Sequence, residues 1–324
     1  MTSTATTNAP PPDPAIDVRG LVKRYGEHTA LDGFDLRVPR GAFFGLLGPN
    51  GAGKTTTVGV LTTLVRPTAG TARLLGWDVV AERDRVRSAV GVVFQEAALD
   101  PELTAREHFD LQARLYHVEN ARARVDEMLD LVGLTQDAKR PARQLSGGMK
   151  RRLEIGRGLL HQPRVLFLDE PTLGLDVSAR ARIWEYLRAL HASGDTTVFL
   201  TTHSMEEADE LCEALAIVDG GRILATGSPE VLKAGLGGDV VRIALERADG
   251  ARELLERVAG VQEVAAEARD AATFRITVAD GPQRLAELIE RVRALGVREV
   301  TLHRPSLGHV FLHHTGHRFE EADA

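Results

Sequence analysis

The chain has 324 residues, enough for about two domains, and its 43% hydrophobic and 27% charged residues are typical of a soluble globular protein. The formal net charge of −6 argues against nucleic acid as the main partner, because such partners usually require a basic surface. The single cysteine, Cys212, excludes an intramolecular disulfide and a cysteine-built metal site, and its apolar neighbours predict a buried residue in a reducing, cytoplasmic compartment.

The N-terminal segment, residues 1–15, is rich in Thr, Ala and Pro and lacks both a basic start and an apolar stretch. These features predict a disordered tail rather than a signal peptide. No apolar run in the chain approaches the roughly 18 residues that cross a bilayer, so we expect no membrane span. A function at a membrane would therefore require another chain to supply the spanning part.

The ordered part is predicted to begin near Ile16. Residues 16–19 and 34–38 alternate between apolar and polar side chains, which predicts antiparallel strands with one face in water. Residues 41–47 form a continuous apolar run that suits a buried strand. From there to about residue 223 strand and helix patterns alternate, with a charged helical insert around residues 104–133. This order favours a layered α/β core.

Residues 48–55 read Gly-Pro-Asn-Gly-Ala-Gly-Lys-Thr and match the phosphate-binding P-loop between a buried strand and a predicted helix. Glycines allow the backbone N–H groups to wrap phosphate oxygens, and the helix directs its positive end at the same anion. Lys54 would reach the β- and γ-phosphates, and the Thr55 hydroxyl would bind Mg²⁺. The predicted nucleotide-binding residues here are Gly48, Pro49, Asn50, Gly51, Ala52, Gly53, Lys54, Thr55 and Thr56.

The apolar run at residues 165–168 ends in two carboxylates, Asp169 and Glu170. Asp169 at the end of a buried strand can hold Mg²⁺ through water. Glu170 is then placed to act as the general base on the attacking water. An exposed Asp-Glu turn after a strand is common, but its position downstream of a P-loop favours the catalytic interpretation.

The Gly-rich stretch at residues 233–238 is a candidate linker, because the order of elements changes beyond it. The patterns predict a strand, a helix, two strands, a helix and a strand, at residues 239–245, 250–258, 261–265, 273–278, 282–295 and 297–302. This β-α-β-β-α-β order is that of the ferredoxin-like fold.

Residues 145–149, Leu-Ser-Gly-Gly-Met, resemble the signature of the ATP-binding cassette (ABC) ATPase family. Ser146, Gly147 and Gly148 would open a helix and form a second anion site at its N-terminus. In the family this site closes on the γ-phosphate of the ATP that the opposite subunit holds. The resemblance therefore implies a homodimer with two ATP molecules between its subunits.

Four further positions resemble family residues, in the family's order along the chain. Tyr25 is similar to the aromatic residue that stacks on adenine, and Gln95 to the glutamine that senses Mg²⁺ and faces the membrane subunit. Asp176 lies in a loop similar to the one that crosses the dimer interface. His203 is similar to the switch histidine that contacts the γ-phosphate. The resemblance thus implies catalytic roles for Glu170, His203 and Gln95, with Thr55, Gln95 and Asp169 around Mg²⁺.

The resemblance covers about residues 16–232 and implies a RecA-like core, an N-terminal antiparallel β subdomain and a helical subdomain at about residues 96–160. A small ferredoxin-like α+β domain would follow at residues 239–316, and residues 317–324 would form a tail. ATP and Mg²⁺ are the implied cofactors. A separate integral-membrane permease and a second copy of the chain are the implied partners, at the cytoplasmic face of the membrane.

The C-terminal end separates the classes within the family. Residues 305–316 resemble the closing Ser-Leu-x-x-Val-Phe-Leu-x-x-Thr-Gly segment of drug-exporter ATPases of the daunorubicin-resistance type, and residues 99–104 resemble the same branch. One departure is Gly308-His309, where relatives carry an acidic pair. The physical role expected of Val310-Phe311-Leu312 is an apolar helix face that docks on the domain.

The function expected from the resemblance is therefore ATP hydrolysis that powers efflux of a hydrophobic drug or antibiotic. An importer ATPase with a regulatory C-terminal domain, or an exporter of lipid or polysaccharide, remains the alternative. A soluble ABC ATPase ranks last, because it would carry two cassettes or a long heptad insertion and this chain has one P-loop and one signature.

Overall fold

The computed structural model describes residues 13–315, apart from 96–98, 193–195, 268–269 and 304. The predicted tails lie outside the described residues, except for residues 13–15 at the start. The chain forms two compact units that divide between Thr226 and Gly227. No helix in the described ranges is long and apolar enough to cross a membrane.

The first unit is built around a six-stranded sheet in the order β10-β9-β3-β8-β7-β6. These strands are β3 (Phe43–Leu47), β6 (Val90–Val93), β7 (Val165–Asp169), β8 (Thr197–Thr202), β9 (Ala214–Asp219) and β10 (Arg222–Gly227). Strands β9, β3, β8, β7 and β6 pair in parallel, and every residue of β3, β7 and β8 is buried. Continuous apolar runs suit such strands, because helices and a second sheet cover both of their faces.

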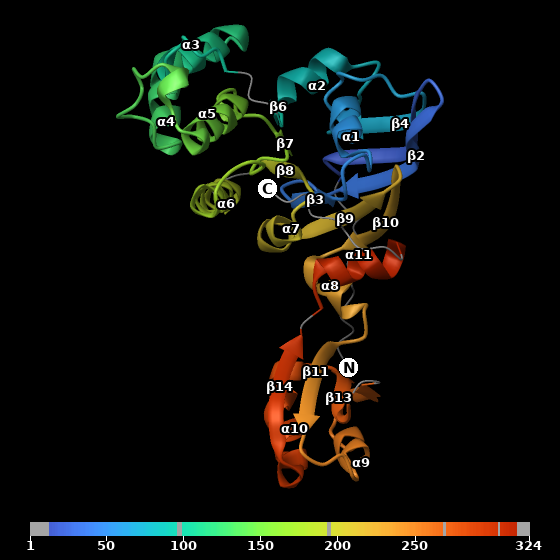
Figure 1. Cartoon of the computed structure of the whole chain (residues 1–324). Helices are drawn as coiled ribbons and strands as arrows, with labels where there is room; N and C mark the ends of the chain where they lie inside the picture. Colours follow the sequence, from blue (N-terminus) through green and yellow to red (C-terminus); the bar gives the residue numbers. More distant parts are fainter. Residues whose placement is uncertain (1–12, 96–98, 193–195, 268–269, 304, 316–324) are drawn as a thin grey trace, which may run out of the picture. The chain divides into compact units, whose positions relative to one another are not determined.

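A second, antiparallel sheet has the order β2-β1-β4-β5. It contains β1 (Ile16–Tyr25), β2 (His28–Val38), β4 (Ala69–Leu74) and the short β5 (Trp77–Asp78), so the antiparallel strands predicted from the alternating pattern are confirmed. Helix α1 (Lys54–Leu61) contacts β2 and β4 of this sheet and also β7 and β8 of the central sheet, while α7 (Met205–Leu211) contacts β3 and β8 from the other face (Figure 1). One apolar core therefore joins both sheets through α1.

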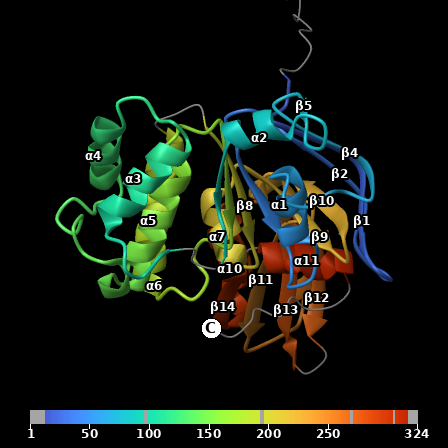
Figure 2. The ribbon, with the colours of Figure 1, turned by 90° about the horizontal axis from the view of Figure 1, so that it is seen from above.

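The helical part of the first unit lies between β6 and β7 in the sequence. Figures 1 and 2 show α3 (Ala105–Leu115), α4 (Ala121–Leu131) and α5 (Gly147–Leu159) gathered to one side of both sheets. The predicted helical stretch at 104–133 is thus two helices, and Asn120 between them has a left-handed φ of 50°. Thr104 and Glu107 cap the start of α3 reciprocally in a capping box. Helices α2 (Arg83–Ala89) and α6 (Val177–Ala192) and the 3-10 turn η1 (Ala142–Gln144) complete the unit.

The second unit contains a four-stranded antiparallel sheet in the order β12-β13-β11-β14. Its elements are α8 (Pro229–Ala234), β11 (Asp239–Leu245), α9 (Ala251–Glu256), β12 (Val261–Glu267), β13 (Asp270–Val278), α10 (Gly281–Val292), η2 (Arg293–Leu295), β14 (Val297–His303) and α11 (Leu307–Thr315). In this order the second strand of the chain pairs with the third, and the first lies between the third and the fourth. The sheet therefore has the split β-α-β arrangement that the sequence predicted.

Two details of the second unit bear on the sequence predictions. The predicted linker overlaps the end of α8 and continues to Gly238, whose φ is 119° and whose Cβ, if present, would lie 2.7 Å from the carbonyl oxygen of Val278. Only glycine fits that position without strain. Helix α11 contacts α8 and buries Leu307, Val310 and Phe311, whereas Leu312 is 38% exposed. The apolar face predicted at 310–312 therefore excludes its last residue.

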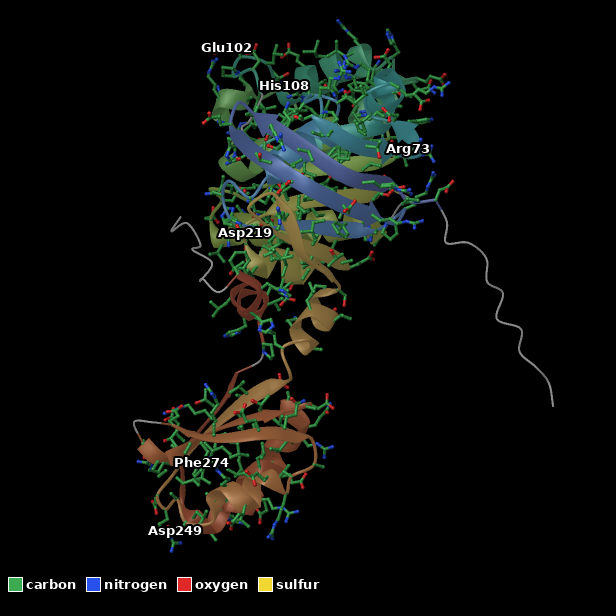
Figure 3. The ribbon with its side chains drawn as sticks, turned by 90° about the vertical axis from the view of Figure 1, so that its right-hand side faces the viewer. Arg73, Glu102, His108, Asp219, Asp249 and Phe274 are labelled. Carbon is green, nitrogen blue, oxygen red and sulfur yellow. The ribbon has the colours of Figure 1, made fainter. Side chains whose placement is uncertain are left out.

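The core of the second unit depends on Phe274, which lies on β13 and is labelled in Figure 3. We expect Phe274→Ala to lower the free energy of unfolding of this unit by about 3–5 kcal/mol, because it removes a buried ring and leaves a cavity. Urea-dependent hydrogen exchange of peptides from β11 to β14 measures this change. Arg275→Ala, on the adjacent exposed position, is the matched control. Equal losses in the two variants would contradict the assignment of the core face.

Candidate functional site

The phosphate-loop sequence joins the end of β3 to the start of α1. A Cβ atom at Gly48 would collide with the carbonyl oxygen of Val218. Gly53 has a φ of 100°, and its Cβ would lie 2.6 Å from the carbonyl oxygen of Ala30. The loop therefore passes so close to neighbouring backbone that these two positions accept only glycine.

Lys54 is the first residue of α1, and its side chain is almost completely buried. Its Nζ donates to the carbonyl oxygens of Gly48, at 2.7 Å, and Pro49, at 3.0 Å. It also lies 3.2 Å from Oε1 of Glu170, which follows β7. A buried ammonium group requires such partners, because an unpaired charge in this environment would be strongly destabilising.

The other carboxylate oxygen of Glu170 lies 3.1 Å from Nδ1 of His203, just after β8. Burial acts to raise the pKa of Glu170, but the hydrogen bond with His203 and the charge of Lys54 outweigh it and hold the pKa below its ordinary value. The carboxylate is therefore ionised at neutral pH, which is the state that a general base requires.

These groups border a pocket of about 390 Å³. Its lining residues are Tyr25, His28, Ala30, Asn50, Gly51, Gly53, Lys54, Thr55, Thr56, Gln95 and Glu170. The structure thus brings together most of the predicted loop, the predicted adenine-stacking Tyr25, the predicted Mg²⁺-sensing Gln95 and the predicted base. His28 and Ala30 were missed by the sequence analysis, although the tight β1–β2 connection places them opposite the end of β1.

Tyr25 is 48% exposed, and the ammonium group of Lys23 lies 4.6 Å from the centre of its ring. This cation–π contact occupies one face of the ring and orients it. Tyr25 also lines the pocket, and an aromatic ring with one face covered is suited to stacking with a planar base on the other face.

The residues predicted around Mg²⁺ carry oxygen donors of the type that this ion prefers. Thr55 and Gln95 line the pocket directly. Asp169 is 1% exposed, and the hydroxyl of Thr201 donates to its Oδ1. Mg²⁺ usually retains waters and takes one or two carboxylates together with substrate phosphates. The donor set therefore fits Mg²⁺, with Asp169 in a supporting position beside Glu170.

Four predicted residues, Ser146, Gly147, Gly148 and Asp176, lie elsewhere on the first unit and do not line the pocket. Ser146 caps α5, and its Oγ accepts from the backbone N–H of Met149 at 3.3 Å. Asp176 precedes α6, and its Oδ1 accepts from the backbone N–H of Ala179 at 2.9 Å. A Cβ atom at Gly147 would lie 3.7 Å from Leu175, so the starts of the two helices are neighbours. The predicted site is thus in two separate halves within one chain.

Glu207 on α7 forms a buried network that the sequence analysis missed. Its Oε1 accepts hydrogen bonds from the hydroxyl of Thr172, at 2.7 Å, and from Nε1 of Trp184, at 3.1 Å. Burial raises its pKa even though these donors act in the opposite direction. The carboxyl joins the loop after Glu170 to α6 and to the helix after His203. The sequence did not indicate burial, because Glu207 follows Glu206 near the start of a helix, where glutamates are usually exposed.

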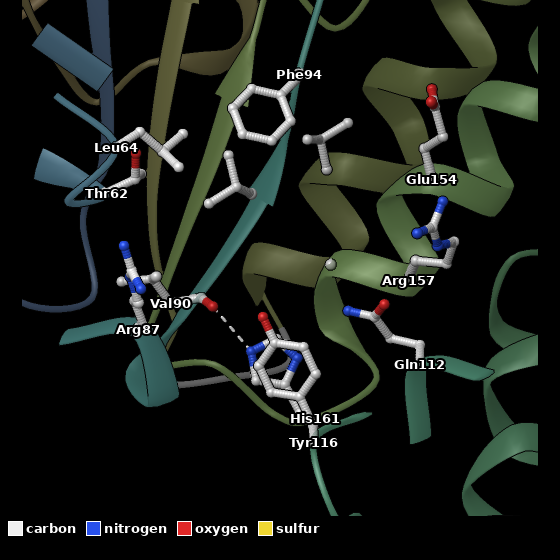
Figure 4. Close-up of a pocket in the computed structure, with 13 residues that line it drawn as sticks. Thr62, Leu64, Arg87, Val90, Phe94, Gln112, Tyr116, Glu154, Arg157 and His161 are labelled. Atoms are coloured by element: carbon white, nitrogen blue, oxygen red, sulfur yellow. Dashed lines mark hydrogen bonds between the residues drawn. The ribbon is translucent and has the colours of Figure 1, made fainter. Parts of the chain in front are cut away.

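A second cavity, of about 340 Å³, lies between β6, the end of α1 and the helices α3 and α5 (Figure 4). Leu64, Phe94 and Tyr116 contribute exposed apolar surface to it. His161 stacks on Tyr116 with ring centres 3.9 Å apart, and its Nε2 lies 2.9 Å from the carbonyl oxygen of Val90. Burial lowers the pKa of His161, so the ring is neutral at physiological pH. The cavity is therefore lined mainly by apolar surface, with Arg87 and Arg157 on opposite sides of it (Figure 4).

The two units match different family models. Residues 31–173 match the model described as "ABC transporter". Residues 227–315 match the model described as "ATP-binding protein DrrA1-3-like, C-terminal domain". Each compact unit of the structure thus contains one matched region.

Curated relatives match nearly the whole chain. The daunorubicin resistance ATP-binding protein DrrA3 of Streptomyces coeruleorubidus is 46% identical over 94% of this chain and 96% of the relative. The daunorubicin/doxorubicin resistance ATP-binding protein DrrA of Streptomyces peucetius is 42% identical, with 94% of each chain covered. The Nod factor export ATP-binding protein I of Ralstonia nicotianae is 43% identical over 95% of this chain and 96% of the relative.

Solved structures resemble the chain over about the length of the first unit. An ATP-binding subunit of an ABC transporter superposes with a TM-score of 0.62 at 28% identity, covering 69% of this chain and 93% of that chain. An ATP-binding cassette in a dimeric post-hydrolysis state, bound to ADP and phosphate, gives a TM-score of 0.60 at 28% identity, covering 66% of this chain and 98% of that chain.

The raised pKa of Glu207 predicts a pH effect on stability. A carboxyl whose folded pKa exceeds its unfolded value binds more protons in the folded state, so its contribution is fully present below the unfolded pKa and is lost as pH rises through the folded pKa. Glu207→Gln keeps an oxygen acceptor for Thr172 and Trp184 but cannot ionise. We therefore expect the variant to gain stability relative to wild type as pH rises from 4 to 8.

Thermal unfolding followed by tryptophan fluorescence measures this difference, because both tryptophans, Trp77 and Trp184, lie in the first unit. Glu206→Gln on the same helix is the control for the loss of one negative charge at a more exposed position. A constant difference between the Glu207 variant and wild type across this pH range would show that the pKa of Glu207 is not raised.

Proposed function

The chain belongs to the ABC transporter family, as an ATP-binding subunit that couples ATP hydrolysis to export, and on this premise we propose that it powers efflux of a hydrophobic drug or antibiotic through a separate permease. The observation that carries the drug assignment is the near full-length similarity to the daunorubicin resistance subunits, which extends through the C-terminal domain. The C-terminal segment at 305–316 supports the same branch.

ATP would bind in the pocket that Lys54, Thr55, Gln95 and Glu170 line. Its adenine would stack on the free face of Tyr25, and the loop N–H groups and Lys54 would take the phosphates. Mg²⁺, held by Thr55 and Gln95 with Asp169 in support, would neutralise the charge that develops on the phosphates. The 390 Å³ volume and the buried ammonium group support this placement.

Phosphate oxygens would compete with Glu170 for Lys54. The carboxylate would then be free to take a proton from the attacking water, and His203, on its other oxygen, would fix its orientation. Since the pKa of Glu170 lies below its ordinary value, the base is ready without a prior proton transfer.

We propose that hydrolysis requires a homodimer. Ser146, Gly147, Gly148 and Asp176 lie outside the pocket of their own chain but are arranged together at two helix starts. The N-terminus of α5 would supply N–H groups and a positive helix end to the γ-phosphate held by a second copy. Closure of the dimer would depend on that phosphate, which ADP lacks. ATP would therefore favour the closed dimer more strongly than ADP does.

The permease would dock in the groove lined by Leu64, Phe94 and Tyr116. Exposed apolar side chains in a concave surface are typical of protein contacts. Phe94 in this groove precedes Gln95 in the nucleotide pocket, so docking and nucleotide binding act on one short segment. The chain would then reside at the cytoplasmic face of the membrane as a peripheral subunit.

Glu170→Gln tests the base and the dimer together. We expect ATP hydrolysis by the purified chain to fall by about 10²- to 10⁴-fold, because the amide cannot take a proton from water. ATP binding should persist and trap a dimer that gel filtration resolves. Glu253→Gln, on an exposed position of α9, is the control for the substitution itself. A variant that remains monomeric with ATP would contradict the base assignment or the dimer.

A transport assay tests which class of cargo the chain exports. We expect ATP-dependent uptake of a fluorescent anthracycline into inverted membrane vesicles that contain the chain and its permease, and no uptake with Glu170→Gln. Equal uptake with the wild-type chain and with the Glu170→Gln variant would show that hydrolysis at this site does not power transport. Hydrolysis without uptake would contradict drug efflux and favour the second candidate, export of lipid or polysaccharide, for which the similarity to Nod factor export subunits is the specific support.

A further inference from the structure

Arg151 has no assigned role, yet its guanidinium is one of the most connected groups of the first unit. It lies on α5, five residues beyond the Ser146 cap, and is 7% exposed. It donates five hydrogen bonds. Nε donates to the carbonyl oxygen of Pro171, at 2.7 Å, and Nη1 donates to the carbonyl oxygen of Phe94, at 2.6 Å, and to Oε2 of Glu154, at 3.1 Å. Nη2 donates to the carbonyl oxygens of Asp169, at 3.1 Å, and Glu170, at 3.3 Å. Four of these acceptors are backbone carbonyls, of which Phe94 lies just after β6, Asp169 ends β7, and Glu170 and Pro171 lie in the loop after β7.

The backbone at Glu170 explains why so many bonds meet there. Glu170 has a φ of 46°, a left-handed conformation that is strained for a residue with a side chain. Its N–H donates to the carbonyl oxygen of Thr201 at 3.0 Å and also lies 3.2 Å from the hydroxyl of the same residue. Its own carbonyl oxygen accepts from Arg151. The strained residue is therefore fixed on one side by β8 and on the other by Arg151.

The conformation of this backbone decides where the carboxylate points. In the observed conformation its two oxygens lie 3.2 Å from Lys54 and 3.1 Å from His203. A change of φ at Glu170 would rotate Cβ about the N–Cα bond and so change the direction in which the side chain leaves the backbone. Strain at a functional residue persists only where the surrounding structure over-determines it.

We propose that Arg151 is a positioning residue for ATP hydrolysis, which holds Glu170 in its left-handed conformation and so aims the general base at the nucleotide pocket. The planar guanidinium suits this role, since its five N–H groups lie in a fixed fork that reaches several carbonyls at once. The inference rests on the assignment of Glu170 as the base, but it does not depend on what is transported.

The neighbouring Arg152 provides a matched control on the same helix. Its Nη1 donates to the carbonyl oxygen of Val132, at 2.6 Å, within the helical part of the unit. Arg152→Lys and Arg151→Lys are therefore the same chemical change at adjacent positions, of which Arg151 is buried and Arg152 is half-buried. Lysine retains the positive charge in both variants but cannot reproduce the fork of donors.

The test is steady-state hydrolysis of Mg-ATP by the full chain, with the Kd of a fluorescent ATP analogue and the midpoint of thermal unfolding measured on the same samples. For Arg151→Lys we expect kcat to fall by about 10- to 100-fold while the Kd changes by less than about twofold, since only the base is misplaced. Arg152→Lys should leave both quantities within about twofold of wild type.

A second experiment distinguishes positioning from a general structural role. If Arg151 acts through Glu170, adding Arg151→Lys to Glu170→Gln should lower the residual hydrolysis by less than about twofold further. Full multiplication of the two effects would overturn the proposal. It would also be overturned by an Arg151→Lys chain with wild-type kcat, or by parallel losses of kcat, nucleotide affinity and thermal stability. Because these assays need hydrolysis alone, a failure of drug uptake in vesicles would leave the outcome unaffected.

Discussion

The functional pocket depends on one buried charge cluster, in which Glu170 lies between Lys54 and His203. These residues follow β7, β3 and β8, which are neighbours in the central sheet and run in parallel. Parallel strands place their C-terminal ends at one edge of a sheet, where ligands of such folds bind. A buried Lys54 or Glu170 without the other would be strongly destabilising, so the same ion pair stabilises the fold and shapes the pocket.

The same sheet explains why a single chain presents two separate groups of predicted site residues. The pocket forms where the loops after β3, β6 and β7 meet, whereas the signature residues lie at the start of α5, within the helical part between β6 and β7. Arg151 on α5 bridges these regions by donating hydrogen bonds to the backbone just after β6, at the end of β7 and in the loop after β7. A rigid guanidinium fork gives this bridge a defined geometry that an apolar contact would lack.

Sequence reasoning predicted the elements that depend on local patterns and missed those that depend on long-range packing. The buried strands, the glycine loop and the ferredoxin-like strand order follow from apolar runs, glycines and alternation, and the structure contains them. Arg151 and Glu207 were missed because charged residues in a run such as Lys150-Arg151-Arg152 are usually solvated. Helical spacing contained a signal, since Arg151 shares a face of α5 with the buried Ile155 and Gly158. The backbone carbonyls that Arg151 contacts are 18–57 residues away, at or just after the ends of β6 and β7, and no local pattern connects these positions to α5.

The pair formed by Lys54 and Glu170 has a consequence for the energetics of nucleotide binding. A phosphate group that reached Lys54 would take the place of the Glu170 carboxylate, an anion that the protein itself supplies, so nucleotide binding would be an ion exchange. The cost of separating Lys54 from Glu170 would offset part of the attraction between lysine and phosphate, and this offset would limit the affinity for nucleotide. The displaced carboxylate is the same group that we propose as the general base. Under the proposed function, binding of phosphate and release of the base from Lys54 would be a single exchange reaction, which departure of phosphate would reverse.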